Sequence, residues 1–168
     1  MAATLLPIAP SDRALDRDAR ALHGALSDLI RVYQFRDRDR ICCHDISVTQ
    51  CYGLESLALC GAQTLNELAA HLYLDKSTAS RVVDALERKG YVVRAPHPTD
   101  GRAVLLELTS AGRTLYERIE REILAEERDL LAGFDPEIRQ AMTQLVARLA
   151  RAAATRVEAG GGSCCRLP

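Results

Sequence analysis

The stretch TLNELAAHLYLDKSTASRVVDALERKGYVVR (residues 64–94) decides the fold of this 168-residue chain. Thr64 followed by Glu67 is a capping box, in which each side chain accepts a hydrogen bond from the other residue's backbone N–H. The box predicts a short helix over 65–72. After a tight turn, the helical spacing resumes over 76–89 and predicts a second helix. Two short helices joined in this way are typical of a helix-turn-helix unit.

The second of these helices has two chemically different sides. Asp75 can cap it, and Gly90 ends it. Its inward side is apolar and contains Ala79, Val82, Val83 and Leu86. Its N-terminal polar residues are Lys76, Ser77, Thr78, Ser80 and Arg81. Because small hydroxyl side chains permit a close approach and Arg81 can reach guanine or phosphate, we expect this helix to read DNA in the major groove.

A β-hairpin is predicted directly after the two helices. YVVRA (91–95) and AVLLEL (103–108) are β-prone runs, and the segment PHPTDGR between them is rich in turn residues. Arg102 is then placed to reach a minor groove, and Asp100 can orient its guanidinium. Residues 63–102 carry six Lys or Arg against five Asp or Glu, which is weak electrostatic support. The alternative is a plain helical hairpin with a solvated polar face.

Two helices are predicted before this unit. Apolar residues at helical spacing indicate a long amphipathic helix over 12–36, which the charged stretch 37–45 interrupts. Ser47 begins a further helix and Gly61 ends it. The expected core positions of that helix are Val48, Leu54, Leu57 and Ala58.

Two long helices are predicted after the hairpin. The first runs over 110–132 and ends at Gly133, and the second runs to about Val157 with Pro136 at its first position. Their aliphatic stripe consists of Leu115, Ile119, Leu131, Ile138, Met142, Leu145 and Leu149. This stripe exceeds what a monomer of this layout can bury, so we expect a homodimer.

The composition narrows the class of protein. The chain is 48% hydrophobic and 27% charged, has a net charge of −1, and contains 4% aromatic residues and no Trp. Near-zero charge argues against a protein that coats nucleic acid non-specifically. No apolar run is long enough to span a bilayer, and the N-terminus lacks the basic region of a signal peptide. We therefore expect a cytoplasmic protein without membrane contact.

Three segments carry a resemblance to a known family: ISVTQCYGLESLA (46–58), the opening stretch 64–94, and TDGRAVLLELTSAG (99–112). Together they resemble the MarR family of bacterial transcriptional regulators. The resemblance implies a mainly α fold with a small β-hairpin wing. It implies one domain over 1–168, in which 47–109 form the winged helix-turn-helix lobe. The dimerisation helices would then be 12–46 and 110–157, followed by a flexible, Cys-containing tail over 158–168.

The same resemblance implies a function. A homodimer would bind double-stranded operator DNA with a pseudo-palindromic sequence and repress transcription, with no cofactor required for DNA binding. Carried over position by position, the recognition helix supplies Ser77, Thr78, Ser80 and Arg81, and the wing supplies Asp100 and Arg102. The resemblance does not specify the signal, since family members respond to aromatic ligands, oxidants or metals.

The cysteines are the unusual feature and suggest a signal. Cys42, Cys43 and Cys51 lie near the start of the helix that Ser47 caps, where the helix dipole lowers a thiol pKa. Cys60 points to the opposite face of that helix from Cys51 and is expected to be a buried core thiol. The glycine-rich tail carries a second vicinal pair, Cys164 and Cys165.

Such a thiolate set suits soft metals or metalloids. The expected ligands are Cys42, Cys43, Cys51, Cys164 and Cys165. As(III) is favoured, ahead of Hg(II), Cu(I), Cd(II) or Zn(II), and His44 is adjacent as a fourth ligand for zinc. Binding of the ion would release the repressor from its operator.

Four alternatives remain open at this point. Oxidation of a cysteine is one, and an aromatic ligand held by Tyr33 and Tyr52 is another. A thiol-dependent enzyme is a distant third, because Cys43 and His44 form the only close nucleophile–base pair and no phosphate-binding glycine loop is present; we expect no enzyme. A protein-interaction adaptor is the fourth.

Overall fold

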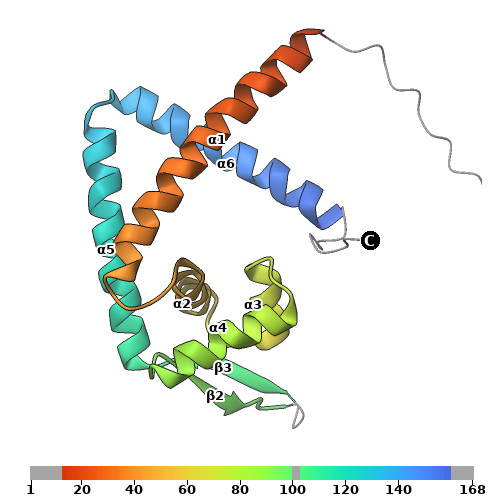
Figure 1. Cartoon of the computed structure of the whole chain (residues 1–168), viewed down its shortest axis with the longest axis vertical. Helices are drawn as coiled ribbons and strands as arrows, with labels where there is room; N and C mark the ends of the chain where they lie inside the picture. Colours follow the sequence, from red (N-terminus) through yellow and green to blue (C-terminus); the bar gives the residue numbers. More distant parts are fainter. Residues whose placement is uncertain (1–12, 100–102, 160–168) are drawn as a thin grey trace, which may run out of the picture.

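The structure is a computed structural model that describes residues 13–99 and 103–159. Over these residues it forms six helices and three short strands (Figure 1). In chain order they are α1 (Arg13–Cys42), α2 (Val48–Cys60), β1 (Gln63–Thr64), α3 (Leu65–His71), α4 (Lys76–Arg88), β2 (Val92–Pro96), β3 (Val104–Leu108), α5 (Ser110–Ala132) and α6 (Pro136–Ala159). The predicted fold class, mainly α with a small β wing, is confirmed.

The helix-turn-helix forms where the capping signals predict it. Thr64 Oγ1 accepts from the backbone N–H of Glu67 at 3.3 Å, and the Glu67 carboxylate accepts from the N–H of Thr64 at 2.7 Å. Asp75 accepts from the N–H of Thr78 at 2.9 Å at the start of α4. Gly90 follows α4 with a φ of 75°, a left-handed conformation that glycine adopts readily. These caps place α3 and α4 within about a residue of their predicted bounds.

The wing is part of a three-stranded antiparallel sheet with the strand order β1-β3-β2. In the predicted hairpin, Val92 pairs with Leu108 and Pro96 with Val104. The third strand, β1, was missed. It has only two residues, Gln63 and Thr64, and pairs with β3 beside the start of α3. A strand this short has no alternating pattern, so only tertiary pairing reveals it.

The core lies inside the lobe formed by α2 to β3, and both flanking helices contribute to it. Its most buried lobe side chains are Leu54, Leu57, Leu68, Val83, Leu86, Val92 and Leu106. Ile41 from the end of α1 and Ile119 from α5 complete the same cluster. The expectation that Leu115 and Ile119 belong to a dimerisation stripe is wrong, because this part of α5 packs on α2 and buries both side chains.

The join between β3 and α5 requires a glycine. Thr109 caps α5 through the N–H of Gly112 at 3.0 Å, and its hydroxyl donates to the carbonyl of Gly90 at 2.7 Å. A Cβ added at Gly112 would overlap the carbonyl oxygen of Tyr91. The quoted run TSAG therefore sets how closely α5 approaches the lobe.

Helix α1 is longer than predicted. The charged stretch 37–45 does not interrupt it: the helix continues to Cys42. Its last turns are held by Ile41, which is buried in the core, and by polar contacts to α5 described below. A turn then leads to Ser47, which caps α2 in a capping box with Gln50.

The N-terminal part of α1 extends away from the lobe, and α6 runs from the far end of α5 back across the view above the lobe (Figure 1). Both carry exposed apolar side chains: Leu15, Leu22, Leu29, Ile30, Val32 and Phe35 on α1, and Ile138, Met142, Leu145 and Val146 on α6. Across the described residues, no helix is both long and apolar enough to cross a membrane.

Candidate nucleic-acid interface and effector cavity

Helix α4 presents its first polar residues outward while its apolar side is anchored in the core. Ala79, Val83 and Leu86 are fully buried. Lys76, Ser77 and Arg81 are exposed, and Thr78 and Ser80 are half-buried beside them. The predicted division of this helix into an inward and an outward side is confirmed. The exposed side has the donors and acceptors that a major-groove reading helix requires.

A hydrogen-bond network orders these polar residues in the protein without DNA. The Asp75 carboxylate accepts from the hydroxyls of Ser77 at 2.6 Å and Thr78 at 2.7 Å. The Thr78 oxygen in turn accepts from the Arg81 guanidinium at 3.2 Å. The hydrogen bonds from Ser77 and Thr78 hold the pKa of Asp75 well below its usual range. The carboxylate thus acts as a cap and also positions three residues of the exposed polar face, Ser77 and Thr78 directly and Arg81 through Thr78, a role that the sequence pattern did not indicate.

An arginine of the wing, Arg94, holds the hairpin against α4. From the sequence alone, this residue was included only in the charge count of residues 63–102. Arg94 of β2 forms an ion pair with Asp84 of α4 at 2.6 Å and a second one with Glu87. These contacts fix the hairpin relative to α4. The predicted wing residues Asp100 and Arg102 lie outside the described residues, between Pro96 and Val104.

A cavity of about 260 Å³ lies between α1, α2 and α5. Its apolar lining comes from Ile41, Ile119, Ile123 and Leu124, and its other lining residues are Arg36, Asp37, Cys51, Tyr52, Glu55, Tyr116 and Glu120. A neighbouring hollow of about 520 Å³ is lined by Tyr33 and Tyr52, among others. The two tyrosines that were expected to hold an aromatic ligand therefore line one hollow; the ligand itself stays a prediction.

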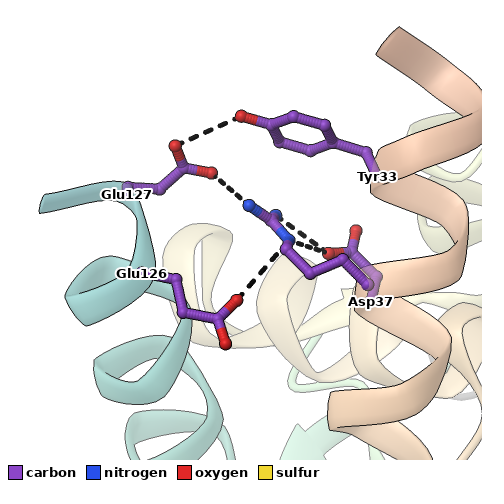
Figure 2. Close-up of polar contacts among 5 residues, drawn as sticks. Tyr33, Asp37, Glu126 and Glu127 are labelled. Atoms are coloured by element: carbon purple, nitrogen blue, oxygen red, sulfur yellow. Dashed lines mark hydrogen bonds and ion pairs between the residues drawn. The ribbon is translucent and has the colours of Figure 1, made fainter. Parts of the chain in front are cut away.

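Arg36 lines the cavity and also ties α1 to α5 (Figure 2). Its Nη1 donates to Glu127 at 2.6 Å, its Nη2 donates to Asp37 at 2.9 Å, and Nε lies 3.9 Å from Glu126. Tyr33 donates from its hydroxyl to Glu127 at 3.2 Å, and the guanidinium lies 4.0 Å from the Tyr33 ring centre. Burial lowers the pKa of Arg36, but hydrogen bonds to Glu127 and Asp37 outweigh it and raise that pKa. The guanidinium is a permanently charged link between the two helices.

The cysteines of α2 differ from their predicted roles. Cys51 is only 6% exposed and lines the cavity, and burial, with Glu55 and Asp37 nearby, raises its pKa to about 12. The expectation that the helix N-terminus lowers this pKa is wrong, because desolvation dominates. Cys60 is exposed, so its expected burial is also wrong. The two thiols do lie on opposite helix faces, but it is Cys51 that faces inward.

The remaining predicted ligands are not brought together by the described residues. Cys42 is the last residue of α1 and its side chain is outside the description, as are Cys164 and Cys165. Cys43 is exposed, and His44 Nε2 lies 3.2 Å from Glu122 Oε2 of α5. In the part of the chain that the structure describes, no three His, Cys, Asp or Glu side chains form a group that could hold a metal. The thiolate site stays a prediction.

Comparison with known proteins identifies relatives of this chain. The MarR family model matches residues 46–104. An uncharacterized HTH-type transcriptional regulator of Mycobacterium bovis is 36% identical over 131 residues, which cover 70% of this chain and 89% of that protein. The multiple antibiotic resistance protein MarR of Salmonella typhimurium is 38% identical over 74 residues, which cover 44% of this chain and 51% of that protein.

Solved structures agree with the fold. A MarR family protein from Bacillus stearothermophilus superposes with a TM-score of 0.75 at 24% identity, covering 83% of this chain and 97% of that one. The structure of NadR in complex with 4-hydroxyphenylacetate superposes with a TM-score of 0.60 at 24% identity, covering 89% of this chain and 98% of that one.

Proposed function

The chain belongs to the MarR family of transcriptional regulators, and from that premise we propose that it is a homodimeric repressor. In this proposal α4 and the wing of each subunit read one half of a pseudo-palindromic operator. An effector bound between α1, α2 and α5 releases the DNA. The Mycobacterium bovis relative is named a transcriptional regulator, which supports a regulatory rather than an enzymatic role.

One observation carries the DNA-binding proposal: the ordered polar face of α4. Ser77, Thr78 and Arg81 are pre-positioned by Asp75 on the exposed side of a helix whose other side is anchored in the core. A helix that meets base edges with its N-terminal residues needs such an arrangement.

The homodimer is supported by the exposed apolar residues of the two terminal helices. Leu22 and Leu29 of α1 and Ile138 and Leu145 of α6 are each about half exposed or more in a single chain. Apolar side chains at helical spacing on two projecting helices are costly in water and are covered when a second copy packs against them.

The cavity is the first candidate for the effector site. Its wall residue Arg36 is also the link from α1 to Glu127 of α5. A ligand that binds only one arrangement of these helices shifts the equilibrium between DNA-competent and released forms. Arg36 can couple ligand binding to the arrangement of α1 and α5, because the same side chain lines the cavity and contacts Glu127 of α5.

A soft metalloid is the second candidate signal. The observation in its favour is the exposed Cys43, which follows Cys42 at the end of α1, directly before α2. As(III) would be held by Cys42 and Cys43 with Cys51 or the tail pair Cys164 and Cys165. Arsenite added to the reduced protein–DNA complex tests it. Release should be lost in Cys43→Ser and kept in Cys60→Ser, which removes an exposed thiol outside the set.

The DNA-binding proposal is tested by fluorescence anisotropy on the DNA upstream of the protein's own gene. Arg81→Ala should weaken binding by about 1–3 kcal/mol if Arg81 makes a specific base contact. Arg88→Ala is the matched control, since Arg88 is exposed in the last turn of the same helix. Equal affinities of the two variants, or no binding by the wild type, would contradict the proposed function.

A further inference from the structure

The cavity between α1, α2 and α5 is apolar in its walls and acidic in its charge. Among the described side chains, three carboxylates line it, those of Asp37, Glu55 and Glu120, against one guanidinium, that of Arg36. Aliphatic side chains and the tyrosines Tyr52 and Tyr116 supply the remaining surface. A pocket with apolar walls and a few converging polar groups is the usual form of a small-molecule site.

The positive charge of Arg36 is paired with carboxylates other than Glu55 and Glu120. Its guanidinium bonds Asp37 beside it on α1 and Glu127 on α5. Three acids, Asp37, Glu126 and Glu127, lie within 4.0 Å of it. Arg36 therefore leaves the charge of Glu55 and Glu120 uncompensated.

Glu55 and Glu120 face this cavity from two different helices and repel each other. Glu120 accepts a hydrogen bond from the Tyr116 hydroxyl at 3.0 Å. Glu55 is half-buried and makes no hydrogen bond or ion pair with another described residue. Burial raises the pKa of Glu55, and the charge of Glu120 raises it further. A cation between the two carboxylates would relieve both penalties.

We propose that the effector of this cavity is a small organic cation, with its protonated amine between Glu55 and Glu120 and its apolar body against Tyr52, Tyr116 and the aliphatic wall. This proposal rests on the proposed function, in which the cavity is the effector site. It adds that the effector carries a positive charge. The tyrosine rings favour it, because aromatic faces attract ammonium groups. An anionic ligand would meet the same carboxylates and be repelled, so this cavity differs in charge from one that selects an aromatic acid.

Three probes of one shape test the charge directly. Tyramine, tyrosol and 4-hydroxyphenylacetate share a phenol ring and a short chain and end in an ammonium, a hydroxyl and a carboxylate respectively. Their affinities for the full chain are measured by isothermal titration calorimetry at neutral pH. Tyramine should bind at least ten-fold more tightly than tyrosol, and the acid should bind more weakly still. No saturable binding of tyramine, or binding of the acid as tight as that of the amine, overturns the proposal.

Substitutions of the two glutamates test whether the ammonium group of tyramine binds between them. Glu55→Gln and Glu120→Gln keep the shape and remove one carboxylate each, so each should weaken tyramine about ten-fold and leave tyrosol unchanged. Glu117→Gln is the matched control, an exposed glutamate of α5 outside the lining. Tyramine affinity that is unchanged in both cavity variants overturns the proposal. A thermal melt of each variant without ligand verifies that it is folded.

The same samples separate this inference from the proposed function. If the protein binds its DNA and tyramine does not bind, the cation assignment fails and the repressor stands. If tyramine binds with the expected dependence on Glu55 and Glu120 but the DNA is not bound, the cation assignment stands and the repressor fails.

Discussion

Arg36 of α1 donates a hydrogen bond from Nη1 to Oε1 of Glu127 on α5 at 2.6 Å, across 91 positions of the sequence. This contact joins the helix that leads into the lobe to the helix that leaves it (Figure 2). Arg36 also lines the cavity, so one side chain belongs both to the cavity wall and to the contact between these two helices.

Replacing Arg36 with Met should lower the free energy of unfolding by about 1 kcal/mol, because two partly buried carboxylates lose their partner. Urea denaturation measures it. Arg31→Met is the control, because the Arg31–Asp28 pair on the same helix is largely exposed and should cost less than about 0.5 kcal/mol. Equal losses in the two variants would show that the Arg36 contact does not stabilise the α1–α5 join.

The stability of α4 should depend on acid pH through Asp75. Its pKa is lowered in the folded protein by hydrogen bonds from Ser77 and Thr78, so its contribution is complete above the pKa of an unfolded Asp, about 3.9, and is lost as the pH falls toward the folded value. Asp75→Asn can still cap the helix but does not titrate. Its melting temperature should therefore fall less between about pH 5 and pH 2 than that of the wild type. Parallel curves would contradict this account.

Arg94→Ala should weaken operator binding about ten-fold, or about 1.4 kcal/mol, although Arg94 is engaged with Asp84 and Glu87 rather than directed at DNA. The reason is that the wing is no longer fixed against α4 before binding. Anisotropy measures the affinity, and circular dichroism verifies the fold. Arg113→Ala, at an exposed position of α5, should leave the affinity unchanged; a loss of similar size there would remove the bracing role.

The two cysteines of α2 should react at very different rates. Cys51 is buried with a pKa of about 12, whereas Cys60 is exposed on the same helix. Because only the thiolate reacts, native Cys51 should be alkylated by iodoacetamide at least about 100-fold more slowly than Cys60 at pH 8, as followed by peptide mass spectrometry. In denaturant the two rates should converge. Fast labelling of native Cys51 would show that the cavity wall opens.

Local signals in the sequence were sufficient to predict the helix-turn-helix. The caps at Thr64, Asp75 and Ser47 act within three or four residues of themselves, so each helix start could be predicted without knowledge of the rest of the fold. The inward side of α4 followed from its 3.6-residue period, and Ala79, Val83 and Leu86 are indeed buried. The matching family segments cover this same part of the chain.

Helix–helix packing decided the rest. The length of α1, the burial of Cys51 rather than Cys60, and the place of Leu115 and Ile119 in the core all depend on α5 packing against α1 and α2. The winged helix-turn-helix elements α3 to β3 separate α5 from α1 and α2 in the sequence, and no local period encodes which of two amphipathic faces meets the other.

The sequence by itself therefore determined the helix-turn-helix, its reading face and the wing strands, because capping, periodicity and turn chemistry are local. Only the tertiary structure decided the acidic cavity and the Arg36–Glu127 link. The charged residues involved lie between positions 36 and 127 of the sequence. The desolvation of the Cys51 thiol, and of a Glu55 carboxylate that has no partner among the described residues, can be recognised only once the helices that bury them are brought together.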